Sequence, residues 1–438
     1  MQTLDPETET ARAGRTPPLH LAFVEALSTI GEADPEWPAV MAGFLVLRFT
    51  SKWADAVVRG GPAPWLREVH GIHEAIAAVE PGPTRRMLEN LYAAVLGAWG
   101  ERTARRDIRV STTLLAYGHH LQQDGAWARS GDVFETFIGY AESDEEYELV
   151  PEAYLRLAHA LRMAGRIDDA AAVYDAGGAL AAAEGNVRAA LLSRVGAARV
   201  LRHRGNMPAA SAALDAVIAD ATELVTQRPS AALRDALARA KHELGTICYD
   251  GDQHERSAVL YYEALQLYED ERSRERVLGD LATNLADLGF TDAARDGNLI
   301  LYATAREASV RQTAGCNLMR LASIDRQEVV FEQYRRALGS EMMSSEISAG
   351  YFVLVGEGFR QFGRVAAARS AFLRAVELAE QHQLNAWLMR ADAGLASAGR
   401  PVVEPTDAAA ADIETAAPAV HFVAQAVRRL REQALAAV

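Results

Sequence analysis

Apolar residues recur at intervals of three and four along most of the chain, which is the spacing of one helix face. Turn signals interrupt the pattern in the first third, at the segments GEADPEWP, RGGPAP and EPGP. In one of these stretches Trp65, Val69, Ile72 and Ile76 fall on a single helix face. The pattern predicts helices over residues 20–31, 37–58, 63–79, 84–100 and 103–123.

From about residue 106 the chain repeats a frame in which two helices flank a turn residue, usually glycine. In the clearest copy, YLRLAHALRMAGRIDDAAAVYDAG, Ala158 precedes Gly165, and Ala170 and Tyr174 follow it. Small residues let the two helix backbones approach, and bulky residues fill the remaining space. One such hairpin cannot bury its apolar face alone, so neighbouring copies are expected to stack. The turns are expected at residues 125, 165, 205, 252, 289, 325 and 363.

This frame resembles the tetratricopeptide repeat family over residues 106–398. The turn-to-turn spacing of 36 to 47 residues exceeds the family's usual period of about 34, so the helices or their connections are longer than usual. The family's leading Trp and closing Pro are missing. The resemblance implies an all-α fold, a right-handed superhelical solenoid of about seven helix-turn-helix repeats.

The segments outside the repeats predict the rest of the organisation. We expect a disordered tail over residues 1–18, an N-terminal helical domain over 19–105 and a linker over 399–416. A last helix is expected over 417–438.

That C-terminal helix carries one apolar stripe. Val420, Val423, Val427 and Leu430 recur at alternating intervals of three and four residues. The stripe predicts a capping helix that seals the last repeat. A helix that binds a partner or dimerises is the alternative, and the sequence leaves both open.

Composition and charge narrow the function classes. The formal net charge of -14, from 59 acidic and 45 basic residues, argues against a general nucleic-acid-binding protein. Cys248 and Cys316 lie in apolar helical patterns without a CxxC spacing, so we expect buried thiols.

The polar N-terminus lacks the apolar core of a signal peptide, and the most apolar stretch, residues 39–47, is too short to span a membrane. A cytoplasmic protein with no membrane partner is expected.

Motifs of the common catalytic classes are missing from the sequence. It contains no GxxxxGK[ST] phosphate loop, no GxSxG nucleophile elbow and no HExxH metal pair. His70 and His73, with Glu68 and Glu74 beside them, could present two imidazoles and a carboxylate to one metal, although this spacing also arises by chance. They are the candidates for an enzyme site hidden in the N-terminal domain. The main expectation is a protein without catalytic residues, metal or cofactor.

The resemblance also implies where a ligand lies, because in tetratricopeptide arrays the first helix of each pair lines the concave surface. Arginine forks suit carboxylates, so a basic cluster there implies a protein or peptide partner with acidic or C-terminal carboxylate groups. Ordinary solvated surface residues are the alternative interpretation. The positions that carry over from the family are His119, His159, Arg162, Arg199, Arg202, His203, Arg239 and His242.

The sequence therefore predicts a scaffold or adaptor that binds a protein or peptide. The main alternative is a regulatory sensor, because a helical N-terminal domain before long repeats resembles the bacterial peptide-pheromone-responsive regulators. Residues 1–105 contain no convincing helix-turn-helix DNA reader, so such a sensor would act on a protein. The partner's identity and the oligomeric state stay open.

Overall fold

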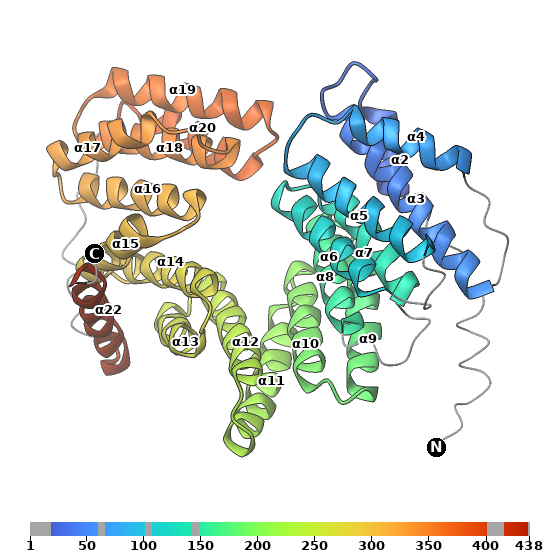
Figure 1. Cartoon of the computed structure of the whole chain (residues 1–438). Helices are drawn as coiled ribbons and strands as arrows, with labels where there is room; N and C mark the ends of the chain where they lie inside the picture. The colour runs from blue at the N-terminus through green and yellow to red at the C-terminus, as the bar shows by residue number, and fades with distance from the viewer. Residues whose placement is uncertain (1–18, 60–65, 101–106, 142–148, 401–415, 437–438) are drawn as a thin grey trace. The chain divides into compact units, whose positions relative to one another are not determined.

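The part of the protein described by the computed structural model is all α-helical, as predicted (Figure 1). It comprises residues 19–59, 66–100, 107–141, 149–400 and 416–436. The predicted tail lies outside these ranges, as does the predicted linker apart from residues 399, 400 and 416. The helices that precede the repeats are α2 (Leu21–Thr29), α3 (Trp37–Arg59), α4 (Leu66–Ala77) and α5 (Pro83–Gly100).

Helical pairs follow, each with a first helix, named here the A helix, and a second, the B helix. This arrangement confirms the predicted helical repeat. The pairs are α6 (Ile108–Gln123) with α7 (Trp127–Ala141), α8 (Val150–Met163) with α9 (Ile167–Ala183), α10 (Val187–His203) with α11 (Met207–Gln227), α12 (Ala231–Asp250) with α13 (His254–Leu267), α14 (Glu271–Asp287) with α15 (Thr291–Thr304), α16 (Ala308–Ile324) with α17 (Glu328–Gly339), and α18 (Ser345–Gln361) with α19 (Val365–Gln381). The last two helices are α20 (Asn385–Ser397) and α22 (Pro418–Ala436).

The turn between α8 and α9 shows why the frame needs its landmark glycine. The N–H of Gly165 donates to the carbonyl of Arg162 at 3.1 Å, and the N–H of Arg166 donates to that of Leu161 at 2.9 Å. These two bonds define a Schellman motif, whose turn residue takes a positive φ that glycine adopts without strain. Gly165 has a φ of 79°. Equivalent residues with positive φ stand at the other pair turns: Gly125, Gly205, Asp252, Gly289, Arg326 and Gly363.

One of these turns lies a residue later than predicted. In the pair α16/α17 the residue with positive φ is Arg326, at 56°, and not Asp325. Asp325 still belongs to the end of α16, where its N–H donates to the carbonyl of Leu321 at 3.0 Å. Its carboxylate pairs with Arg295 of α15, so this acid ties two pairs together and does not form the turn.

The small residues at fixed places in the frame provide close approach between helices, as predicted. Gly356 of α18 illustrates the constraint, because a Cβ there would lie 2.7 Å from Cε1 of Phe372 in the paired helix. That separation is far below van der Waals contact, so any side chain at this position would displace the ring. The corresponding alanines are fully buried: Ala158, Ala170, Ala198, Ala210 and Ala368.

The protein divides into two compact units, Met1–Ala213 and Leu214–Val438. In the first unit one hydrophobic core extends from Phe23 in α2 to Val200 in α10. Helix α3 packs on α4 and α5 and also on α7, a helix of the first pair. The helices before the repeats therefore share their core with the first pairs.

The second unit holds the C-terminal helix in a place that the sequence did not predict. Helix α22 does not seal α18/α19 as a cap. It packs on α13 and α15, the B helices of two earlier pairs (Figure 1). The end of the array is already covered by α20, which packs on both α18 and α19. The apolar stripe of α22 is therefore buried elsewhere, with Val420, Val423 and Val427 in the core around α13 and α15.

Both cysteines are buried free thiols, as predicted. Burial raises the pKa of Cys316 to about 12, which keeps the thiol protonated and a poor nucleophile. Within the described ranges, no helix has the length and apolar character needed to span a membrane.

Candidate partner-binding face

The A helices of the first unit carry six of the eight predicted site residues. Helices α8 and α10 pack directly on each other, so their facing side chains form one surface, named here the α8–α10 seam. The six residues are His119 on α6, His159 and Arg162 on α8, and Arg199, Arg202 and His203 on α10.

Arg162 lies at the end of this seam near the turn after α8 and bonds to two histidines. Its Nη1 donates to Nε2 of His203 at 2.7 Å, and its Nη2 donates to Nδ1 of His159 at 3.1 Å. Guanidinium nitrogens only donate, so the ring nitrogens that accept from them carry no proton. The indole of Trp127 meets His159 edge to face, with ring centroids 5.4 Å apart. Arg162 is thus held in one orientation by uncharged ring nitrogens.

The other end of the seam holds a carboxylate paired with two arginines. Glu152 of α8 accepts from Nε of Arg156 at 2.8 Å and lies 3.5 Å from Nη1 of Arg188 on α10. Glu152 stands in the first turn of α8, and Arg162 stands in the last turn. Along α8 the seam therefore changes from a paired carboxylate to a guanidinium.

Arg199 and Arg202 extend the basic end along α10. Arg199 stands three residues before Arg202 and four before His203, so it neighbours each of them on the helix surface. Arg199 and Arg202 are half-buried, whereas His203 is exposed. His119, on α6, packs edge to face on Phe134 of α7 at 6.2 Å. Its ring therefore has a packing contact within its own helical pair.

Arg239 and His242 lie on α12 in the second unit, and both pair with acids. Nε of Arg239 donates to Asp235 at 3.0 Å. Nε2 of His242 lies 2.8 Å from Oδ2 of Asp280 on α14, and its Nδ1 lies 3.3 Å from the hydroxyl of Tyr268. The His242 side chain is only 13% exposed. His242 therefore bridges α12 to its neighbours, whereas the Arg239–Asp235 pair lies within α12.

A contact that the sequence did not predict links the same helices. The hydroxyl of Tyr249 on α12 donates to Oδ2 of Asp287 on α14 at 2.6 Å. Burial and this bond to a carboxylate raise the pKa of Tyr249 to about 12. Tyr249 stands three residues before its turn residue, as Arg162 does in α8, so the repeat register predicts where it lies. It was not among the predicted site residues because they were selected for positive charge. Trp127 was missed because it belongs to a B helix.

A buried polar network ties α2 to the first pair. The imidazole of His20 lies 3.2 Å from Oγ of Ser51 and 3.4 Å from Oγ1 of Thr136. Oδ2 of Asp132 accepts the N–H of Phe23 at the start of α2, at 3.2 Å. Desolvation lowers the pKa of His20 to about 4 and raises that of Asp132 to about 7. These groups satisfy a helix terminus inside the core.

The metal hypothesis for α4 gains no support from the geometry. His70 and His73 are exposed, and Nε2 of His70 pairs with Glu74 at 3.2 Å. The side chain of Glu68 lies outside the described set. Across the described residues, no three His, Cys, Asp or Glu side chains are grouped to hold a metal ion.

Comparison with known proteins finds no matching family model and no matching curated protein. A solved tetratricopeptide repeat protein from Parabacteroides merdae is 11% identical, with a TM-score of 0.39 over 64% of this protein and 98% of that one. NprR in complex with its cognate peptide NprX is 13% identical, with a TM-score of 0.45 over 86% of this protein and all of that one (100%). Helix order and turn geometry define the fold here. It is a tetratricopeptide-like helical repeat.

Proposed function

We propose that the protein is a cytoplasmic, non-enzymatic scaffold that binds a protein or peptide on the A-helix face of its first unit. The groups recognised there are carboxylates, either from acidic side chains or from the C-terminus of a polypeptide. Arg162, Arg199 and Arg202 supply the positive charge, His159 and His203 contact Arg162, and His119 extends the proposed face onto α6.

The observation that carries this proposal is the orientation of Arg162 by His159 and His203, at 3.1 and 2.7 Å. Two ring nitrogens accept from the guanidinium and so fix its orientation on the A-helix face. A side chain already held in place loses little conformational entropy when a ligand binds, which favours affinity. In a protein of net charge -14, such a preorganised cation selects for anionic groups.

Arginine suits this role better than lysine, because its planar fork matches both oxygens of a carboxylate. At the other end of the seam Glu152 is already paired with Arg156 and Arg188, so the proposed ligand carboxylates are assigned to the Arg162 end. Extended peptides and exposed acidic segments of a folded partner both satisfy this pattern.

An array of acidic nine-residue peptides, each with either a free C-terminal carboxylate or a C-terminal amide, tests the proposal. The wild-type protein is compared with Arg162→Glu/Arg199→Glu/Arg202→Glu. We expect the wild type to retain a subset of peptides and the triple variant to lose them by about 100-fold, since several charge-assisted contacts are reversed. Peptides that bind only with the free carboxylate would identify recognition of a polypeptide terminus.

The matched control is Arg228→Glu/Arg369→Glu/Arg400→Glu, which makes the same charge change at exposed arginines of the second unit. It is expected to bind like the wild type. Circular dichroism verifies that both triple variants fold. Equal binding by the two folded variants would reject the first-unit face as the ligand site, and affinity capture from the native cell with the same pair extends the test to protein partners.

A further inference from the structure

Helix α22 occupies a surface made by helices that lie far from it in sequence. It packs between α13 and α15, although α16 to α20 separate it from them in sequence. Val420, Val423 and Val427 are buried in this contact. Near the start of the helix, Phe422 meets Tyr262 of α13 edge to face, with centroids 5.8 Å apart. The helix therefore binds these two B helices as a ligand would bind a groove.

Charge complementarity reinforces the apolar contact. Asp296 of α15 is only 4% exposed, and its Oδ1 accepts from Nη1 of Arg431 at 2.7 Å. Oδ2 of the same carboxylate lies 3.7 Å from Nε of Arg428. Both arginines belong to α22. A buried carboxylate needs such partners, so the surface of α15 favours a helix that brings arginine to this point.

The N-terminal end of α22 is held by a third polar contact. The N–H of Ala417 donates to Oε1 of Glu255 on α13 at 3.0 Å. The groove thus supplies acids at both ends of the occupant: Glu255 at the start and Asp296 beside its C-terminal half. These two acids match the N-terminal backbone and the C-terminal arginines of a basic amphipathic helix such as α22.

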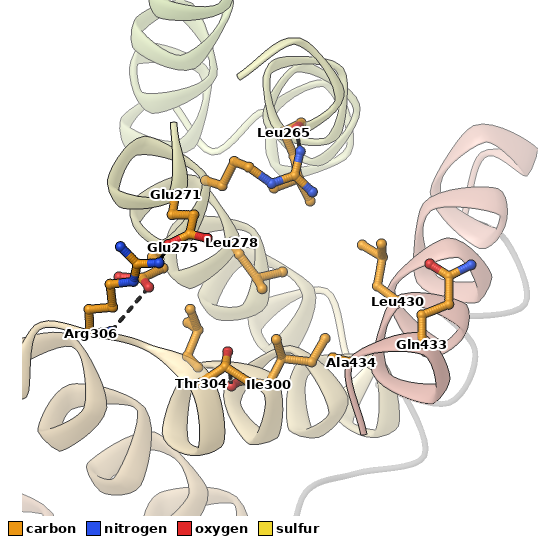
Figure 2. A pocket seen from close by; sticks show the side chains of 12 residues that line it. Leu265, Glu271, Glu275, Leu278, Ile300, Thr304, Arg306, Leu430, Gln433 and Ala434 are labelled. Carbon is orange, nitrogen blue, oxygen red and sulfur yellow. Dashed lines mark hydrogen bonds and ion pairs between the residues drawn. The ribbon is translucent and has the colours of Figure 1, made fainter. Parts of the chain in front are cut away.

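The occupant does not fill the groove. A cavity of about 480 Å³ remains at the C-terminal end of α22 (Figure 2). Its apolar lining comes from Leu265, Leu278, Ile300, Leu301, Leu430 and Ala434. Ala434 presents only a methyl group to this space, although it continues the apolar stripe. A helix with a larger apolar residue at this position would bury more surface in the same groove.

The rim of this cavity is fixed by polar contacts. Arg306 pairs with Glu271 at 2.6 Å, and its backbone N–H donates to Oε1 of Glu275 at 3.1 Å (Figure 2). These contacts join α14 to the segment after α15. The part of the cavity wall that faces α22 is thus built by the repeat itself, and α22 supplies the rest through Leu430, Gln433 and Ala434.

We propose that the surface between α13 and α15 is a helix-docking site for a partner protein, and that α22 is its built-in competitor. The partner segment is a basic amphipathic helix with the α22 pattern, apolar at the positions of Val420, Val423 and Val427 and arginine at that of Arg431. It carries a larger apolar residue at the position of Ala434. Binding of the partner helix displaces α22.

The test uses the full-length protein with a protease site introduced within residues 401–415 and a labelled peptide of residues 416–438 as probe. Fluorescence anisotropy measures peptide binding before and after cleavage. We expect at least about tenfold tighter binding after cleavage, because the tether otherwise holds α22 at an effective concentration in the millimolar range. The Ala434→Leu peptide is expected to bind about tenfold tighter than the parent peptide, because it buries more apolar surface.

Two peptides of equal charge separate the ionic contact from nonspecific attraction. Arg431→Glu is expected to weaken binding at least about tenfold, since it places a carboxylate against Asp296. Arg429→Glu, at an exposed position, is expected to change binding less than about twofold. Altering the peptide leaves the fold of the receptor untouched.

Several outcomes would overturn the proposal. If the cleaved protein keeps α22 and never exchanges it for peptide, α22 is a permanent part of the fold. If the uncut protein dimerises by exchanging α22, as mass photometry would detect, a second copy is the occupant and not a partner. The Arg162→Glu/Arg199→Glu/Arg202→Glu variant should bind the peptide normally, so this site and the first-unit face can fail independently.

Discussion

The α8–α10 seam and the corresponding seam between α12 and α14 use the same positions for different chemistry. In each seam, the residue three positions before the turn residue of one helical pair contacts the residue two positions before the turn residue of the next pair. That pair is Arg162 and His203 in the first unit, at 2.7 Å, and Tyr249 and Asp287 in the second, at 2.6 Å. The repeat fixes where two side chains meet, and residue type decides what the meeting point can bind.

The histidines of the two seams make the same distinction. His159 accepts from Arg162, whereas His242 bonds to a carboxylate and to a tyrosine hydroxyl. The second seam thus joins acids and bases to each other and holds helices together. The first holds a guanidinium oriented by two imidazoles, and the proposed function rests on this arrangement.

The largest expected effect is on how the stability of the first unit depends on pH, because a buried base, His20, and a buried acid, Asp132, both have shifted pKa values there. His20 has a folded pKa of about 4, below its ordinary value, so it stabilises the fold less as pH falls from about 6.5 to 4. Asp132 has a folded pKa of about 7, above its ordinary value, so its contribution to stability is lost as pH rises from about 4 to 7. In the wild type these two groups therefore change the folding stability in opposite directions as the pH changes.

Asp132→Asn keeps an acceptor for the N–H of Phe23 but removes the contribution of Asp132 to the pH dependence of stability. We expect the first unit of this variant to lose about 3 kcal/mol of stability between about pH 7 and 4 through His20, with a smaller change in the wild type. Hydrogen exchange resolved to residues 19–213, at several pH values, measures this. His20→Gln should show the reverse slope, and flat profiles for both variants would contradict the assignment.

The second expected effect is structural and belongs to the α12–α14 seam. His242→Ala removes a mostly buried ring and leaves Asp280 and Tyr268 without this partner, so we expect a loss of about 2 kcal/mol in the free energy of unfolding. The matched change at the exposed His203 is expected to cost less than about 0.5 kcal/mol. Urea denaturation measures both. Equal costs would mean that the two seams are equally structural.

The sequence predicted the fold well because its signals are local. Apolar spacing, landmark glycines such as Gly165 and small residues such as Ala158 each act within one helical pair. The turn at Arg326 was assigned one residue early because no glycine marks it. The place of α22 could not be predicted, since its stripe specifies an apolar partner surface but not which one. Among the described helices, α20 covers the end of the array by packing on α18 and α19.

The candidate site was predictable to a smaller extent. Register placed Arg162 and His203 on the A-helix face, but their contact joins residues 41 positions apart in different pairs. The same register rule put His242 in the cluster, and its partner Asp280 comes from the next pair. Whether a basic side chain contacts an acid, a neutral ring or a ligand depends on which residues the neighbouring helical pair places beside it. Such contacts leave no pattern in a single sequence.

The third prediction sharpens the role of the arginine fork. Arg162→Lys keeps the charge but offers one ammonium in place of two nitrogens that bond His203 and His159. We expect about tenfold weaker binding of the peptides retained by the wild type, roughly 1.4 kcal/mol, with unchanged unfolding. Isothermal titration calorimetry measures this. Arg239→Lys in the second unit is the matched control, and a similar loss there would remove the distinction between the seams.

The smallest expected effect tests whether the Tyr249–Asp287 contact is only structural. Tyr249→Phe removes the hydroxyl that donates at 2.6 Å to an exposed carboxylate, so we expect a cost of about 0.5–1 kcal/mol in the free energy of unfolding. Peptide binding should be unchanged. Asp287→Asn removes the other partner of the same contact, and the double variant should cost less than the sum of the two single changes.

The same contact can be followed through the pKa of Tyr249. Since the carboxylate of Asp287 helps to raise that pKa, ultraviolet titration of Asp287→Asn should show it lower, closer to its ordinary value. Peptide binding that falls with Tyr249→Phe would show that ligand contact extends to the second seam, and the contrast between the two seams would then be wrong.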